Sequence, residues 1–163
     1  MKSIILYSSN SGNTKKLAEA IHEAIPGNKE ITPTTKAPDD LSSYDLICVG
    51  FWLMAGQPDP HTTTFLETIN DKNLFLFATH GAAKDSEHAQ NGIKAARELA
   101  SGNTIVDTFN CPGEVNPKVI EKAKTKPQLP AWVPDAADAV GHPDGADLVA
   151  VQQAITNALQ SLA

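Results

Sequence analysis

The chain has 163 residues, of which 41% are hydrophobic and 20% are charged, and its formal charge is −6. A chain of this length buries about 70% of its unfolded surface, which is enough for a core. Its composition excludes disordered and fibrous proteins. The net negative charge argues against nucleic acid and anionic membrane surfaces as partners, while cationic partners remain open.

The sequence shows no membrane or secretory signal. Its longest apolar stretch, residues 46–56, is much shorter than the roughly 20 residues that cross a bilayer. Residues 1–3 lead directly into an apolar run without the charged region and cleavage site of a signal peptide, so we expect a cytoplasmic protein. Cys48 and Cys111 have neither CxxC nor metal-ligand spacing, so we expect reduced thiols and no bound metal.

The first half of the chain alternates β-branched or aromatic runs with apolar residues at helical spacing. The predicted strands are residues 4–7, an edge strand at 29–32, and a fully apolar strand at 46–49. The helices between and after them are predicted from Leu17, Ile21 and Ile25, and from Phe65, Leu66 and Ile69. The apolarity of the third strand indicates burial on both of its faces.

The second half continues the alternation. We predict strands at residues 74–77 and 104–109, separated by a helix whose buried side carries Ala89, Ile93, Ala96 and Ala100. Asn116 followed by Pro117 is typical of a helix start. The last helix, residues 146–162, is predicted from Leu148, Val151, Ile155, Leu159 and Leu162, which recur at helical spacing and give it one face that can close the fold.

Residues 125–145 interrupt this pattern. They contain Pro127, Pro130, Pro134 and Pro143. Long loops in compact domains are often functional, and the alternative is a surface excursion tethered by Trp132. Because strands otherwise alternate with helices, the sequence predicts an α/β protein with a doubly wound parallel sheet between two helical layers, formed by residues 1–163 as one domain.

A polar loop follows the first predicted strand, and ligands of such sheets collect at the carboxyl ends of strands. The loop lies just before a predicted helix, and its side-chain donors are Ser9, Asn10, Ser11, Asn13 and Thr14. Gly12 lies between them and lets the backbone approach a ligand. Helix-start amides hold a phosphate without needing a cation. The loop lacks the GxxxxGK[ST] and GxGxxG patterns, so nucleoside triphosphates and dinucleotides are not indicated. The alternative is that these residues only cap the helix.

This loop resembles the phosphate loop of flavodoxins, in which hydroxyls and backbone amides hold the 5′-phosphate of FMN. The segments after the third and fourth predicted strands are similar to the two flavodoxin loops that cover the flavin ring. The resemblance implies five parallel strands in the order 2-1-3-4-5 and FMN as the cofactor. It implies ring contacts from Phe51, Trp52, Leu53, Met54, Ala55, Gly56 and Gln57, and from Thr79, His80, Gly81 and Ala82.

The resemblance also suggests roles for single residues. Trp52 stacks on the ring or, alternatively, belongs to the core, and Met54 packs on the flavin with its thioether. Gly56 tolerates either orientation of its peptide, so a neighbouring carbonyl can turn toward flavin N5. His80 is a candidate proton donor near neutral pH.

Two further groups have a functional and a structural interpretation. Asp85, Glu87 and His88 contain metal-ligating side chains, but such residues at a helix start are ordinarily caps. Cys111 is a thiol at a strand end, and since no cation lies near it in sequence, we favour a packing role.

Residues 85–89, 109–113 and 142–144 are similar to small flavodoxin-like proteins of anaerobic bacteria, including those that accompany bilirubin reductase. This likeness implies an electron carrier without catalytic residues, which passes electrons from a reductase to a partner redox enzyme through a flavin edge surrounded by acids. The alternatives are an FMN-dependent reductase of a quinone or tetrapyrrole, with the segment around Trp132 as a lid, and an interaction module without FMN.

Overall fold

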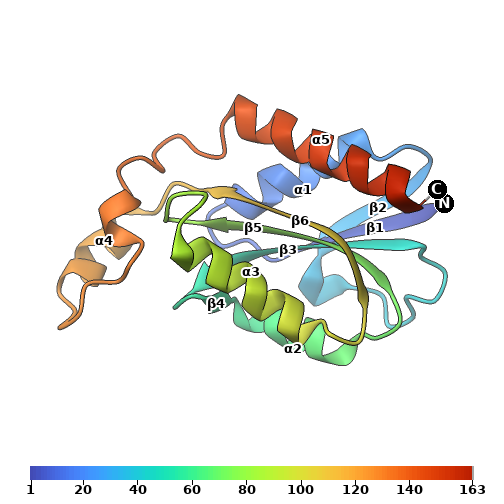
Figure 1. Cartoon of the computed structure of the whole chain (residues 1–163), viewed down its shortest axis with the longest axis horizontal. Helices are drawn as coiled ribbons and strands as arrows, with labels where there is room; N and C mark the ends of the chain where they lie inside the picture. The colour runs from blue at the N-terminus through green and yellow to red at the C-terminus, as the bar shows by residue number, and fades with distance from the viewer. Residues whose placement is uncertain (163) are drawn as a thin grey trace.

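The computed structural model describes residues 1–162 as a parallel sheet between two layers of helices (Figure 1). The strands are β1 (Lys2–Tyr7), β2 (Asn28–Pro33), β3 (Leu46–Met54), β4 (Gln57–Pro58), β5 (Asn73–His80) and β6 (Thr104–Pro112). The helices are α1 (Asn13–Ala24), α2 (Pro60–Thr68), α3 (Glu87–Leu99), α4 (Pro117–Lys124) and α5 (Gly145–Leu162), with short 3₁₀ turns η1 (Thr34–Lys36) and η2 (Val133–Asp135).

The sheet order β2-β1-β3-β5-β6 confirms the predicted fold. All four pairings along this path are parallel. The strand order reverses between β1 and β3, whose carboxyl ends therefore diverge toward opposite sides and leave room for a ligand.

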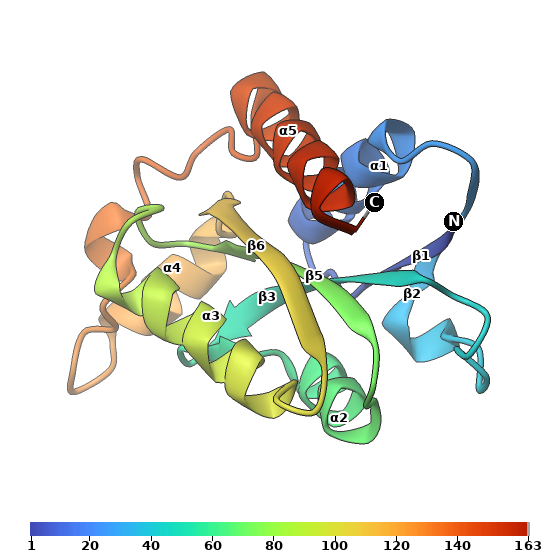
Figure 2. The same cartoon turned by 45° about the vertical axis from the view of Figure 1, so that its right-hand side comes forward.

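Two apolar clusters fill the space on either side of the sheet. Ile5, Cys48 and Phe75 face the layer of α1 and α5, and the alternate residues of the same strands face α2 and α3 (Figure 2). Burial on both faces explains why β1, β3 and β5 are almost continuously apolar. The apolar side of α5 lies as predicted, since Val151 and Ile155 are fully buried against this core.

One strand is longer than the sequence indicates. We predicted that the chain leaves β3 after Val49, but the strand continues to Met54 and turns back through β4, which pairs with it in antiparallel register. Ala55 and Gly56 form the turn, with φ angles of 51° and 77°. Phe51 and Trp52 pair with β5 at the same time, and this extra pairing carries the strand past its apolar start.

The segment after β6 adds α4 and η2 before the chain enters α5. Both lie beyond the carboxyl edge of the sheet, at the end opposite to the two termini (Figures 1 and 2). The start of α5 returns to the same edge and runs beside α1. None of the helices within residues 1–162 combines the length and the apolarity that crossing a membrane requires.

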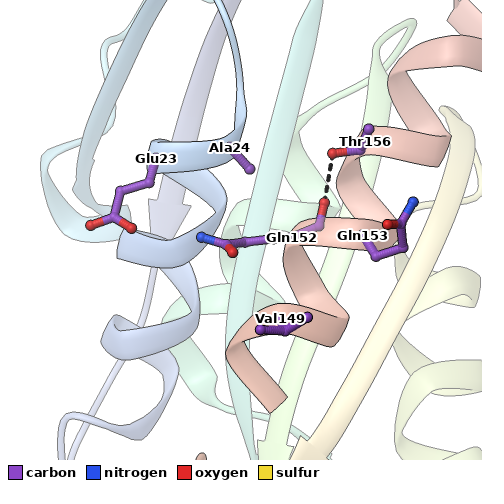
Figure 3. A pocket seen from close by; sticks show the side chains of 6 residues that line it. All are labelled: Glu23, Ala24, Val149, Gln152, Gln153 and Thr156. Atoms are coloured by element: carbon purple, nitrogen blue, oxygen red, sulfur yellow. Dashed lines mark hydrogen bonds between the residues drawn. The ribbon is translucent and has the colours of Figure 1, made fainter. Parts of the chain in front are cut away.

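Two surface hollows are formed without residues of the loop between β1 and α1. One, of about 360 Å³, is lined by residues of α1 and α5, including Glu23, Gln152 and Thr156 (Figure 3). The other, of about 320 Å³, lies between η1 and α2. Both are shallow and lack clustered ionisable groups, so neither competes with the strand ends as a binding site.

Candidate cofactor site

The loop between β1 and α1 presents backbone donors at a helix start. Gly12 caps α1 in the left-handed conformation, with φ of 92°, and the first turn contains no acidic residue. The hydroxyl oxygen of Ser9 accepts a hydrogen bond from the backbone amide of Gly12 at 3.1 Å and a longer one from the backbone amide of Lys15 at 3.4 Å. Its own hydrogen remains free to donate. Within residues 1–162, the amides of Ser11 and Asn13 donate to no protein atom.

Asn13 and Thr14 bind other parts of the protein in this structure. The side-chain amide of Asn13 donates to the backbone carbonyl of Glu114 at 2.9 Å and lies against Gly113, where a Cβ would fall 2.7 Å from its nitrogen. Thr14 is buried, and its hydroxyl lies 2.9 Å from that of Thr79. These two side chains therefore position the loop against the ends of β5 and β6, while Asn10 and Ser11 are exposed.

The β3–β4 hairpin places its predicted ring contacts on different sides. Phe51 is buried in the core beneath α2 and α3. Leu53 packs on α3, where a Cβ at Gly92 would fall 2.5 Å from its side chain. Met54 is 49% exposed near the turn. Trp52 is half-buried on the opposite face of β3, the face of α1 and the polar loop. Of this group, Trp52 is thus the best placed to contact a ligand held at that loop.

The turn of the hairpin lies near the start of α3. A Cβ at Gly56 would lie 3.7 Å from the imidazole of His88, which is ordinary contact. Ala55 and Gln57 flank it with exposed side chains. Ser86 caps α3 by accepting from the amide of Ala89, so the structure supports capping for this stretch.

The end of β5 is fixed by hydrogen bonds. Thr79 is buried on the side of α1. His80 points to the other side, where its Nδ1 lies 3.1 Å from the carbonyl of Ala82 and its Nε2 lies 2.9 Å from the side chain of Asn110. Burial lowers the pKa of His80 below its ordinary value, so the neutral ring is favoured at physiological pH. This environment supports a role in fixing the Gly81–Ala82 turn and does not favour the predicted proton donor.

Residues 125–145, which contain η2 in place of the predicted structureless loop, pack directly on the Gly81–Ala82 turn. A Cβ at Gly81 would lie 2.6 Å from Val115 and 3.0 Å from the indole of Trp132, so only glycine allows this approach. The carboxylate of Asp135 accepts from the amide of Ala83 at 3.0 Å. Trp132 tethers the segment to the sheet edge, at the turn that the sequence predicts beside a flavin.

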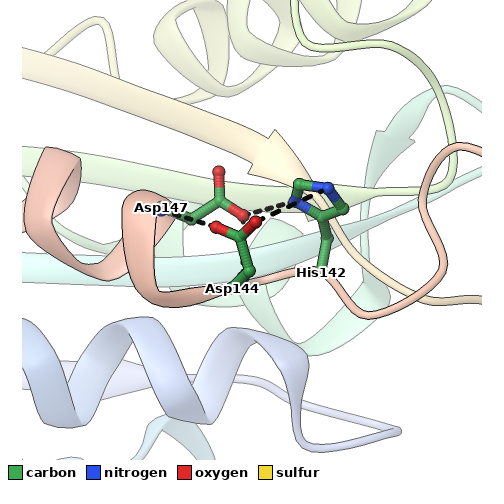
Figure 4. A group of neighbouring side chains, drawn as sticks. All are labelled: His142, Asp144 and Asp147. Carbon is green, nitrogen blue, oxygen red and sulfur yellow. Dashed lines mark hydrogen bonds and ion pairs between the residues drawn. The ribbon is translucent and has the colours of Figure 1, made fainter.

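A hydrogen-bonded group that sequence reasoning missed lies at the start of α5 (Figure 4). Asp144 and Asp147 each accept from the other's backbone amide, and Asp147 also lies 2.6 Å from Nδ1 of His142. This bond raises the pKa of His142 above its ordinary value. The reciprocal amide bonds are a helix cap. The spacing of these acids is the signal that could have revealed the cap. His142 joins residues 125–145, which we call the covering segment, to α5.

Both thiols are buried. Cys48 is buried within β3 and Cys111 within β6, and burial strongly raises the pKa of both. A thiol that stays protonated is a poor nucleophile, so the packing role favoured for Cys111 agrees with its surroundings.

The residues at this edge fit a phosphorylated cofactor. Free helix-start amides, the Ser9 and Ser11 hydroxyls and the absence of a carboxylate from the first turn of α1 form a donor set for an oxyanion. A Cβ on Gly12 would have no atom within 4 Å, so the loop is open above that position.

Comparison with known proteins identifies the family. A sequence profile described as a flavodoxin domain matches residues 4–156. The chain belongs to the flavodoxin family. A relative, the flavodoxin-like domain-containing protein BilS of Clostridioides difficile (strain CD3), is 34% identical over an alignment of 133 residues that covers 79% of this chain and 74% of the relative.

Solved structures share the fold of this chain. An archaeal flavodoxin superposes with a TM-score of 0.58 at 20% identity, over 85% of this chain and 99% of the other. A flavoprotein of Lactobacillus acidophilus, solved in complex with FMN, has a TM-score of 0.55 at 22% identity, over 67% of this chain and 92% of the other. At these identities the likeness concerns the fold alone.

Proposed function

We propose that this protein binds FMN at the carboxyl edge of its sheet and carries electrons from a reductase to a partner redox enzyme. The observation that carries the proposal is the start of α1, where amides that have no acceptor among the described residues surround an open Gly12. FMN ends in a phosphate, which such a helix start binds. The solved flavoprotein that contains FMN has the same fold, which supports the assignment.

The chain's own residues bind and orient the cofactor. The Ser9 and Ser11 hydroxyls and the backbone amides of Ser11 and Asn13 hold the phosphate. Trp52, on the loop side of β3, stacks on one face of the ring, and the backbone of the hairpin turn and of Gly81–Ala82 lines its edge. FMN itself supplies the redox chemistry when bound, and the protein supplies position and electrostatics.

The covering segment favours a second candidate function. Trp132 and Asp135 attach residues 125–145 to the turn after β5, so a small molecule at the flavin would meet this segment. The alternative is therefore an FMN-dependent reductase of a quinone or tetrapyrrole. Because the sequence is similar to flavoproteins that accompany bilirubin reductase, a tetrapyrrole reductase is the first partner to test for the carrier, and a tetrapyrrole the first substrate for the enzyme.

A calorimetric titration of the cofactor-free protein tests FMN binding. We expect saturable uptake of one FMN per chain and much weaker uptake of riboflavin, because riboflavin lacks the phosphate. Equal affinity for both would contradict the assignment of the phosphate loop, and no uptake of either would defeat the proposal.

Steady-state kinetics separate the two functions. A carrier exchanges electrons rapidly with a flavodoxin reductase and does not oxidise NAD(P)H alone. Oxidation of NAD(P)H by the isolated FMN-loaded protein, accelerated by a quinone or tetrapyrrole, would favour the reductase instead.

A further inference from the structure

The segment that contains α4 has the opposite charge to the rest of the chain. Residues 118–126 contain four lysines and one glutamate, a net charge of +3, so the remaining residues carry −9. Lys124 pairs with Glu121 at 3.3 Å across one turn of the helix. Within residues 1–162, Lys118, Lys122 and Lys126 have no carboxylate partner. The basic segment is therefore not neutralised by its own protein.

The surface of this segment is also uncovered and partly apolar. Ala123 is the buried residue of α4, while Val119 and Leu129 are 49% and 51% exposed. A helix of eight residues is marginal without packing, and α4 packs mainly on η2. Apolar side chains among unpaired charges are typical of the core and rim of a transient protein interface.

The basic segment lies next to the candidate cofactor site. Its continuation through Trp132 and Asp135 attaches to Gly81 and Ala83. At its other end, Glu114 binds the side chain of Asn13 in the phosphate loop. Contacts at both ends fix the segment beside the edge through which a bound flavin would exchange electrons, and Figures 1 and 2 show α4 projecting from this end of the molecule.

We propose that residues 117–130 form the docking face for an acidic redox protein. This inference rests on the proposed electron-transfer function and names the partner's chemistry. It adds a positive face, formed by the lysines, to a cofactor edge that we expect from the sequence to be surrounded by acids. A charge of −9 on the rest of the chain repels extended polyanions such as nucleic acids and anionic bilayers, whereas a compact acidic protein can contact the basic face alone.

The test uses an oxidised plant-type [2Fe–2S] ferredoxin, a small acidic electron carrier, as the probe. Titrated into the ¹⁵N-labelled chain, it should shift the amide resonances of the non-proline residues in 117–130 and of residues 81–84. The charge reversals Lys122→Glu and Lys126→Glu together should weaken binding about tenfold, and raising the salt from about 20 to about 200 mM should weaken wild-type binding by a similar factor.

The matched control combines Lys36→Glu with Lys94→Glu. Both side chains are exposed on other elements, and this variant has the same net charge as the test variant. We expect its affinity to stay within about twofold of wild type, since steering depends on where the charge lies. Equal loss in both variants, or resonance shifts confined to other surfaces, would overturn the proposal.

Two further arms distinguish other occupants. Vesicles containing phosphatidylglycerol and a single-stranded oligonucleotide should bind far more weakly than the ferredoxin at the same salt. Tighter binding of either one through the same lysines would overturn the assignment to a protein partner. The titrations do not require FMN, so failure of FMN uptake would defeat the electron-transfer function without being confused with failure of docking.

Discussion

Single residues at the start of α1 decide whether the loop can hold an anion. Gly12 adopts a left-handed conformation with φ of 92°. This conformation costs a residue with a side chain roughly 1 kcal/mol or more. Its peptide is followed by the free amide of Asn13, so a shift of the backbone here would misdirect a donor as well as strain the turn.

Gly12→Ala should therefore weaken FMN binding about tenfold and lower the free energy of unfolding by about 1 kcal/mol. Gly141→Ala is the matched control, because Gly141 has φ of 79° and, like Gly12, open space at its Cβ position. The control should show a similar loss in urea unfolding with unchanged FMN affinity. A calorimetric titration that finds equal affinity in both variants would contradict the role of Gly12.

His142 gives the protein a predictable pH dependence. Its hydrogen bond to Asp147 raises the folded pKa above the ordinary value near 6.5. The protonated form is thus bound more tightly in the folded state, and its contribution is complete below pH 6.5 and is lost as the pH rises through the folded pKa. The free energy of unfolding should fall over this window in wild type, and His142→Gln should flatten the fall in urea titrations. An identical slope in the variant would refute the assignment.

At the level of elements, local patterns predicted most of the fold and missed what depends on distant contacts. The helices α1, α3 and α5 could be predicted because each buries one side, so their apolar residues recur at helical spacing. The extension of β3 was not, because Phe51 and Trp52 owe their strand conformation to β5, a partner more than twenty residues away. The turn at Ala55–Gly56 also lacks the Asn-Gly or Asp-Gly signal of a tight hairpin.

The candidate site shows the same division. The polar loop at the start of α1 could be located because its donors are contiguous in sequence, and its binding of a phosphate stays a prediction. The position of Trp132 against Gly81 could not, since it joins segments about fifty residues apart through a contact that no periodicity encodes. Likewise, Leu53 is predicted to contact the flavin ring from its place in the segment after the third strand, but its side chain packs against Gly92 of α3.

The contact between the β3–β4 hairpin and α3 can be tested at Gly92, where a substitution that normally stabilises a helix should instead destabilise the protein. Gly→Ala inside a helix normally stabilises by about 1 kcal/mol. At Gly92 the new methyl group would fall 2.5 Å from Leu53, so we expect Gly92→Ala to destabilise by about 1–2 kcal/mol. In a Leu53→Ala background the same substitution should stabilise. A double-mutant cycle by urea unfolding measures this, and a stabilising Gly92→Ala in the wild-type background would contradict it.

For the molecule as a whole, α5 completes one of the two helical layers that cover the sheet. It is the last helix, and it packs on α1 and β6. The polar loop directly precedes α1, and the covering segment follows β6 by way of α4. Its buried residues share one apolar cluster with β1, β3 and β5. Loss of packing under α5 should therefore lower the stability of the whole domain, since small domains unfold cooperatively.

Ile155→Ala tests this coupling. Ile155 is fully buried, so we expect the free energy of unfolding to fall by about 2–5 kcal/mol. Val149→Ala on the same helix is the control, because Val149 is 66% exposed and its truncation should change stability by no more than about 0.5 kcal/mol. Since Ile155 lies far from the strand ends, FMN should bind the folded variant with wild-type affinity and raise the unfolding midpoints of both variants. Weakened FMN affinity in Ile155→Ala under conditions where the chain is folded would show that α5 shapes the loop directly, and not only through overall stability.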